Sequence, residues 1–191
     1  MTIIDDNTGL LISAMKFSAF RHRSQRRKDA EGSAYINHPI QVMELIWRVG
    51  GIRESDVLIA ALLHDTVEDT VKPTSVEKVK LEEEIGGLFG KQVLELVLEV
   101  TDDKTKDSEV RKLLQIEHAR THSPGAKLIK LADKTCNVQD IMDHPPVFWC
   151  SSRKHEYLDW AERVVNKLRG TNTQMEQNFD RVLADSRKRV R

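Results

Sequence analysis

The stretch Leu62-Leu63-His64-Asp65-Thr66-Val67-Glu68-Asp69-Thr70 is the most informative part of this chain. It places one histidine and three carboxylates directly after Val57–Leu63, the longest apolar run in the sequence. Acids that emerge from a buried segment repel one another and lose solvation unless a cation compensates them. The stretch therefore says something about chemistry as well as about folding.

Helical geometry would place these four polar side chains on two neighbouring stripes. In a continuous helix His64 and Glu68 share one stripe, and Asp65 and Asp69 share the next, because residues four apart lie on one face. Imidazole and carboxylate together are reasonable ligands for a divalent metal ion. The ordinary alternative is the solvated end of a helix, so the pattern needs a second source of ligands.

His38 is one such source. It directly precedes Pro39, which restricts the preceding backbone and suits the first turn of a helix. A stiff backbone of this kind suits a metal ligand. Taken alone, a capping or core histidine explains His38 better.

Asp133 is the other source. It follows an apolar-rich segment, with Asn137 one turn later on the same face, and an aspartate in a buried helix needs a partner. Four residues, His38, His64, Asp65 and Asp133, would together form a mononuclear site with positions left open for water. An open position is typical of a catalytic metal.

The length, net charge and cysteine content of the chain limit which functions are possible. Its 191 residues suit one domain, and its 30 basic and 30 acidic residues give no net charge to attract nucleic acid or a membrane surface. Two cysteines, Cys136 and Cys150, form no disulfide framework, so a reducing, cytoplasmic setting is the default. We see no signal peptide and no apolar run that approaches a membrane span.

Helical periodicity runs through almost the whole sequence, and no segment reads as a bounded strand. We expect about ten short helices in one all-α bundle. The expected segments are a first helix around Leu10–Phe20, helices from Pro39 and from Ser55, Val76–Phe89 interrupted or ended near Gly86-Gly87, Gln92–Thr101, Ser108–Thr121 capped by Ser108, Pro124–Ile141, His155–Leu168, and a last helix opened by a capping box at Thr171–Gln174.

Two polar segments complement the acids. Arg21–Lys28 is the strongest basic bias in the chain, and a solvated surface explains it as well as a binding role does. Beside a metal site, such cations would neutralise phosphoryl oxygens. Thr101–Thr105 is either a capping loop or a place where Lys104 contacts phosphate. We expect the remaining histidines to lie on the surface or to pack in the interior. We expect the basic tail Arg187–Arg191 to be a solvated or disordered helix end.

These motifs, in this order, resemble the HD-type hydrolase domain of the RelA/SpoT family. The similarity runs from about residue 10 to about residue 180, and it implies a single HD-type domain over 1–191 with its core at about 8–183. The matching segments are Arg26–Asp29, Tyr35–Pro39, His64–Thr70 and Asp133 with Asn137; Val100–Thr105 and Ser123–Leu128 are most similar to the small metazoan members.

The resemblance implies an enzyme that hydrolyses the 3′-pyrophosphate of guanosine tetraphosphate to GDP and pyrophosphate. The bacterial relatives continue into a synthetase, so we expect degradation alone. The implied site comprises one Mn²⁺ on His38, His64, Asp65 and Asp133, catalytic Glu68 and Asp69, and nucleotide contacts at Arg27, Lys28, Lys104, Asn137 and Tyr157.

One departure concerns Cys136, which stands where the close relatives usually have tyrosine. We therefore expect a different pocket wall beside Asn137. In the implied mechanism the metal acidifies the water that attacks phosphorus, while Glu68 and Asp69 orient this water and manage protons.

Three alternatives stay open at this point. The same site could release the 2′-phosphate of NADPH, since that molecule also carries a ribose phosphate. Another HD-type nucleotide phosphohydrolase and a non-catalytic nucleotide-binding protein are the other two. The oligomeric state is open as well, with a homodimer as one arrangement.

Overall fold

The computed structural model describes residues 6–190, which form ten α-helices, as expected for an all-α bundle. Within this range there is no β-strand, and one isolated antiparallel bridge joins Arg26 to Ala34. The helices are α1 Asp6–Arg21, α2 Asn37–Arg48, α3 Ser55–Leu63, α4 Thr66–Thr70, α5 Val76–Phe89, α6 Lys91–Val100, α7 Ser108–His118, α8 Pro124–Asp143, α9 Ser151–Asn166 and α10 Thr173–Arg189.

Helices α3 and α8 lie at the centre of the bundle. The six residues Leu58–Leu63 of α3 are all buried, and α8 is buried along most of its length. Helix α2 packs against both of them, and α6 does the same from another side. The two segments that the sequence marks as apolar therefore form the core around which the other helices assemble.

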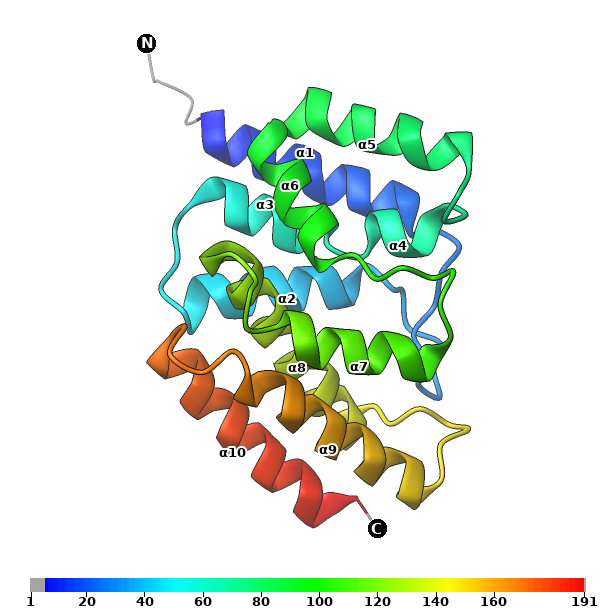
Figure 1. The fold of residues 1–191 in the computed structure, drawn as a ribbon, viewed down its shortest axis with the longest axis vertical. Coiled ribbons are helices and arrows are strands. Elements are labelled where there is room, and N and C mark those ends of the chain that lie inside the picture. Colours follow the sequence, from blue (N-terminus) through cyan, green and yellow to red (C-terminus); the bar gives the residue numbers. More distant parts are fainter. Residues whose placement is uncertain (1–5, 191) are drawn as a thin grey trace.

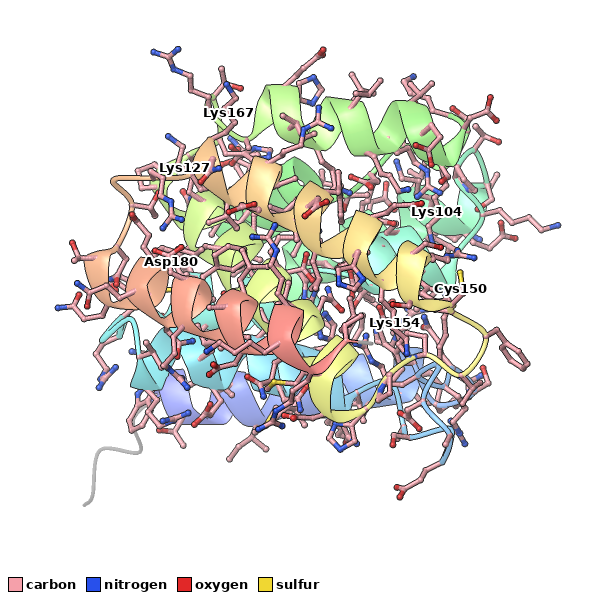
Figure 2. The ribbon with its side chains drawn as sticks, turned by 90° about the horizontal axis from the view of Figure 1, so that it is seen from below. Lys104, Lys127, Cys150, Lys154, Lys167 and Asp180 are labelled. Carbon is pink, nitrogen blue, oxygen red and sulfur yellow. The ribbon has the colours of Figure 1, made fainter. Side chains whose placement is uncertain are left out.

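The outer helices cover this centre in two groups (Figure 1). Helices α1 and α6 contact α3, and α5 packs on α6, whereas α9 and α10 contact α8. Figure 2 shows α9 and α10 from below, with charged side chains such as Lys167 and Asp180 in the outer layer, where both residues are exposed. One cluster of buried apolar side chains extends from Ala14 to Leu183.

Several predicted helix boundaries and caps were wrong. Helix α5 continues through Gly86-Gly87 to Phe89 and is followed by Gly90, whose φ of +91° suits glycine. Gly86 serves close packing instead, because a Cβ there would lie 3.2 Å from Leu94 Cδ2. Asp107, not Ser108, occupies the N-cap position of α7.

The last helix is capped differently from the expected box. The side chain of Asn172 accepts the N–H of Met175, and Glu176, rather than Gln174, receives the backbone N–H groups of residues 170–172. The basic tail is ordered through Val190, since α10 reaches Arg189 and Arg187 donates to Asp159 and Glu162. Arg191 lies outside the described residues.

None of the described helices is long and apolar enough to cross a bilayer.

Candidate metal centre and adjoining pocket

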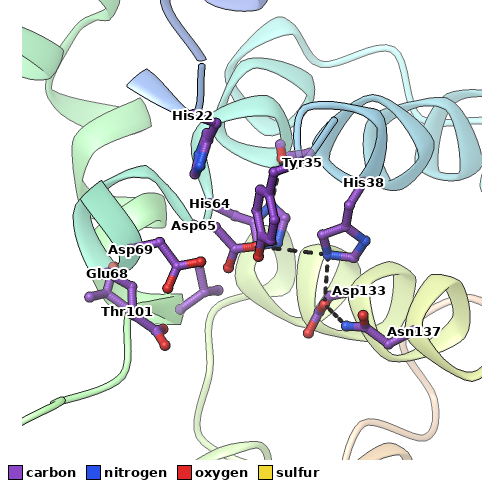
Figure 3. Close-up of polar contacts among 12 residues, drawn as sticks. His22, Tyr35, His38, His64, Asp65, Glu68, Asp69, Thr101, Asp133 and Asn137 are labelled. Carbon is purple, nitrogen blue, oxygen red and sulfur yellow. Dashed lines mark hydrogen bonds and ion pairs between the residues drawn. The ribbon is translucent and has the colours of Figure 1, made fainter. Parts of the chain in front are cut away.

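The chain breaks its helix at His64 and Asp65, between α3 and α4. The stretch is therefore not one continuous helix, and the stripes that such a helix would give do not apply. Asp65 has φ −94° and ψ −5°, the bridge region of backbone space in which many active-site residues lie. The break lets two consecutive side chains, which a helix would separate by about 100°, turn toward the same point (Figure 3).

His64 is held in the form that a metal requires. Its Nδ1 lies 2.8 Å from the carbonyl oxygen of Ala61, which can only accept, so Nδ1 carries the hydrogen. In the neutral ring Nε2 is therefore the nitrogen without hydrogen; it lies 3.0 Å from Asp65 Oδ2 and has no hydrogen-bond partner within residues 6–190. A buried, unpartnered imidazole nitrogen beside a carboxylate fits a metal ligand.

His38 and Asp133 approach the same point from α2 and α8. His38 Nε2 lies 3.2 Å from Asp133 Oδ1 and 3.8 Å from Asp65 Oδ2. Asp133 Oδ2 accepts a hydrogen bond from Lys134 Nζ at 2.9 Å, and Oδ1 accepts one from the Asn137 amide. The packing of α2 against α3 and α8 thus brings together residues that are far apart in sequence.

These groups suit a divalent cation. Ligand atoms of His38, His64 and Asp65 all lie within 4.8 Å of one another, and Asp133 joins them through His38. Burial by itself would raise the pKa of Asp65, but His64 and His38 hold it well below its usual range. Burial would likewise lower the pKa of His64, yet Asp65 raises it to about 9 in the metal-free site, so a bound cation would displace the proton from Nε2. The two carboxylates supply the hard oxygen donors, and the imidazoles the nitrogen donors, of a typical catalytic site.

Glu68 and Asp69 lie side by side on α4 but have different surroundings. Glu68 Oε2 accepts the backbone N–H of Asp102 at 3.0 Å, and Oε1 lies 3.7 Å from Lys104 Nζ. Burial, with the charges of Asp65 and Asp102, raises the pKa of Glu68 to about 7. Asp69 receives hydrogen bonds on both oxygens, from Gln25 and from Lys104. The pair therefore contains one carboxyl group poised to exchange a proton near neutral pH.

A pocket of about 380 Å³ opens beside Asp69. Arg27 forms one wall, donating to Asn137 Oδ1 at 3.0 Å and to Asp140. Tyr157 and the exposed Lys28 also line the pocket. Four of the five predicted nucleotide contacts thus share one cavity. The fifth, Lys104, instead contacts the acid pair.

The expectation for Cys136 was wrong in its location. Its side chain does not line the pocket beside Asn137 but a separate one of about 260 Å³ on another side of α8, together with Glu44 and Arg181. The neighbouring positions 136 and 137 point to different faces of the helix. Asp140 lines both pockets.

Sequence reasoning missed several residues of this site. Tyr35 donates its hydroxyl hydrogen to Asp65 Oδ2 at 2.7 Å, although its place in the Tyr35–Pro39 segment was a usable signal. Lys134 directly follows Asp133, and a lysine inside a buried helix was another signal of an ion pair at this site. No local pattern indicated Gln25 or Asp140. Of the histidines expected at surface or packing positions, His118 and His144 are exposed, whereas His22 is buried beside Tyr35.

Comparison with known proteins agrees with this geometry, since residues 14–156 match the HD domain family. The chain is 51% identical to human guanosine-3′,5′-bis(diphosphate) 3′-pyrophosphohydrolase MESH1 over 87% of this chain and 89% of that protein. It therefore belongs to the HD domain family and, within it, to the group of MESH1 proteins.

Two further comparisons cover almost the whole chain. The protein of the same name from Xenopus tropicalis is 45% identical over 95% of this chain and 97% of its own length. The solved structure of a metazoan orthologue of SpoT, described as hydrolysing ppGpp, superposes with a TM-score of 0.84 at 43% identity and covers 92% of this chain and 94% of that one.

Proposed function

We propose that this protein hydrolyses guanosine tetraphosphate at its 3′-pyrophosphate, giving GDP and pyrophosphate. The observation that carries the proposal is that one pocket is lined by both Asp69 of the acid pair and Arg27 and Lys28 of the basic segment. Hydrolysis of a pyrophosphate ester needs this combination of carboxylates, which take a proton from the water, and cations, which neutralise the pyrophosphate group under attack. The printed names of the MESH1 relatives describe the same reaction.

The proposed cofactor is one Mn²⁺ per chain, held by His38, His64, Asp65 and Asp133. A divalent ion there would polarise phosphoryl oxygens and lower the pKa of water. The unpartnered Nε2 of His64 and the close spacing of the ligand atoms of His38, His64 and Asp65 support this assignment.

We assign the chemical roles in this reaction to residues of the protein. Glu68 takes a proton from the attacking water as the new bond to phosphorus forms. The bond from phosphorus to the ribose 3′ oxygen breaks, that oxygen takes a proton from solvent water, and Glu68 returns its proton to the solvent. Arg27 and Lys28 neutralise the departing pyrophosphate. We also propose that Lys104, Asn137 and Tyr157 contact the nucleotide.

Side-by-side kinetics test this function. Purified protein with Mn²⁺ should release pyrophosphate from guanosine tetraphosphate with a higher kcat/KM than it releases phosphate from NADPH. The reverse order would make the NADPH 2′-phosphatase the better description. Turnover of neither substrate by a metal-loaded protein would contradict both, and would favour another nucleotide phosphohydrolase or a non-catalytic protein.

The cytoplasmic location and the absence of a nucleic-acid partner stay predictions, and a homodimer stays an open arrangement.

A further inference from the structure

Asp69 is held on both sides by residues from distant parts of the chain. Gln25 Nε2 donates to Asp69 Oδ2 at 2.8 Å, and Lys104 Nζ contacts Asp69 Oδ1. The other end of the Gln25 amide, Oε1, lies 2.7 Å from His22 Nδ1. Three side chains, His22 and Gln25 from the loop after α1 and Asp69 from α4, thus form one hydrogen-bonded row.

The chemistry of the three groups fixes the direction of every hydrogen in this row. A carboxylate only accepts, so the end of the Gln25 amide that meets Asp69 has to be the NH₂ group. Gln25 Oε1 then faces His22, and because this oxygen only accepts, His22 Nδ1 carries the hydrogen. Asp69 thus determines the tautomer of His22 through two successive hydrogen bonds, one between Asp69 and Gln25 and one between Gln25 and His22.

The surroundings of His22 favour this neutral form. Its side chain is 2% exposed, and Nε2 meets no hydrogen-bond partner in the described part of the chain. Burial lowers its pKa, although Gln25, Asp65 and Asp69 act in the opposite direction and His64 acts with burial. The ring stacks on Tyr35 with centroids 4.9 Å apart.

Backbone contacts make the row rigid. Gln25 N–H donates to the carbonyl of His22 at 2.9 Å, and its own carbonyl accepts from Tyr35 N–H at 3.3 Å. Tyr35, which covers the His22 ring, also donates to Asp65. The loop after α1 therefore supports both Asp65 and Asp69.

Glu68 lacks this double restraint. Its Oε2 has one hydrogen bond, from Asp102 N–H, while Oε1 has only the more distant cations Lys104 at 3.7 Å and Arg111 at 3.9 Å. One acid of the pair thus has an oxygen available for a proton, and the other has both oxygens engaged.

We propose that Gln25 is a positioning residue for Asp69, and that His22 sets the orientation of the Gln25 amide. Asp69 is then a fixed, charged acceptor, and Glu68 is the member of the pair that exchanges protons. This reading of the catalytic roles rests on the proposed function, whereas the hydrogen-bonded row itself does not.

Kinetics of matched variants test the catalytic part. Gln25→Leu should lower kcat for guanosine tetraphosphate by about tenfold, since a hydrogen bond to a charged group is lost. KM should change by less than about twofold, with one metal ion per chain retained. Gln139→Leu is the control, because it removes the same kind of bond, to Asp143, on the exposed side of α8. An unchanged kcat in Gln25→Leu, or equal losses in both variants, would overturn the proposal.

His22 offers a rescue experiment. His22→Leu removes the donor to Gln25 and should lower kcat, whereas His22→Asn can place an N–H near the former Nδ1 and should restore much of it. A purely structural role would make both variants less stable without this order in kcat. Equal kcat in the two variants would contradict the assigned role of His22.

The tautomer of His22 tests the row without any turnover. Imidazole ¹⁵N NMR of the full-length protein, loaded with diamagnetic Mg²⁺, should show hydrogen on Nδ1 and none on Nε2 of His22, with the resonance assigned by its absence in His22→Asn. Hydrogen on Nε2 would overturn the row. A protein that shows the expected tautomer but does not cleave guanosine tetraphosphate would refute the proposed function alone.

Discussion

Glu68 accepts a hydrogen bond from the backbone N–H of Asp102, 3.0 Å away, which ties the acid pair on α4 to the loop after α6. This contact lowers the pKa of Glu68, but burial and the charges of Asp65 and Asp102 outweigh it and raise that pKa from 4.5 to about 7. The cost of ionising Glu68 has consequences for stability and for catalysis.

The stability consequence depends on pH. Because the folded-state pKa is the higher one, the unfolded chain loses this proton first as the pH rises. The contribution of Glu68 to the free energy of unfolding therefore falls between pH 4.5 and about 7 and stays low above it. Glu68→Gln should raise the free energy of unfolding by about 1–3 kcal/mol at pH 8 relative to its effect at pH 4.5. Urea unfolding with EDTA at both values measures this, and an effect independent of pH would contradict it.

The catalytic consequence is a loss of turnover without a loss of binding. Glu68→Gln keeps the shape and the acceptor for Asp102 but cannot take a proton. We expect kcat to fall by roughly a hundredfold to ten-thousandfold with the metal retained. In the wild type, kcat should rise with pH as Glu68 ionises, and the variant should lack this limb. An unchanged kcat with a raised KM would make Glu68 a binding residue.

The metal assignment predicts one tightly held divalent ion per chain. Asp133→Ala should lose it, because the substitution removes an oxygen donor next to His38. Elemental analysis of the purified proteins measures the ion. Asp143→Ala is the matched control, as this aspartate lies near the end of the same helix and contacts Gln139 and Arg189. Wild-type metal content in Asp133→Ala would remove Asp133 from the ligand set.

The basic segment predicts a contrast between neighbours. Arg27→Ala and Lys28→Ala should each lower kcat/KM by about tenfold or more, because charge-assisted hydrogen bonds to the pyrophosphate are lost. Arg23→Ala should stay within about twofold of the wild type, since Arg23 packs over Phe20 and donates to its carbonyl instead of lining the pocket. Similar, mild effects in all three variants would make this segment an ordinary surface.

The sequence predicted the helical content and the residues that meet at the centre, for identifiable reasons. Val57–Leu63 and the apolar-rich segment before Asp133 are the two most buried helices, so polar groups attached to them had to lie together in the interior. Pattern reasoning works well where burial dominates.

It failed where backbone geometry or distant contacts decide. Asp65 and Asp133 both lie close to His38, a meeting of residues from three helical segments that no local pattern reveals. The interruption expected at Gly86-Gly87 was wrong because close packing against Leu94 explains the glycine. Gln25 contacts Asp69 across 44 positions of sequence, so only the fold identifies it.

Hydrolysis of guanosine tetraphosphate in H₂¹⁸O tests the central claim most directly. Attack on the phosphorus attached to the ribose 3′ oxygen puts the label into pyrophosphate and leaves GDP unlabelled. We predict this outcome for the Mn²⁺-loaded wild type, measured by mass spectrometry of both products. Label in the 3′ hydroxyl of GDP, or release of labelled orthophosphate in place of pyrophosphate, would contradict the account.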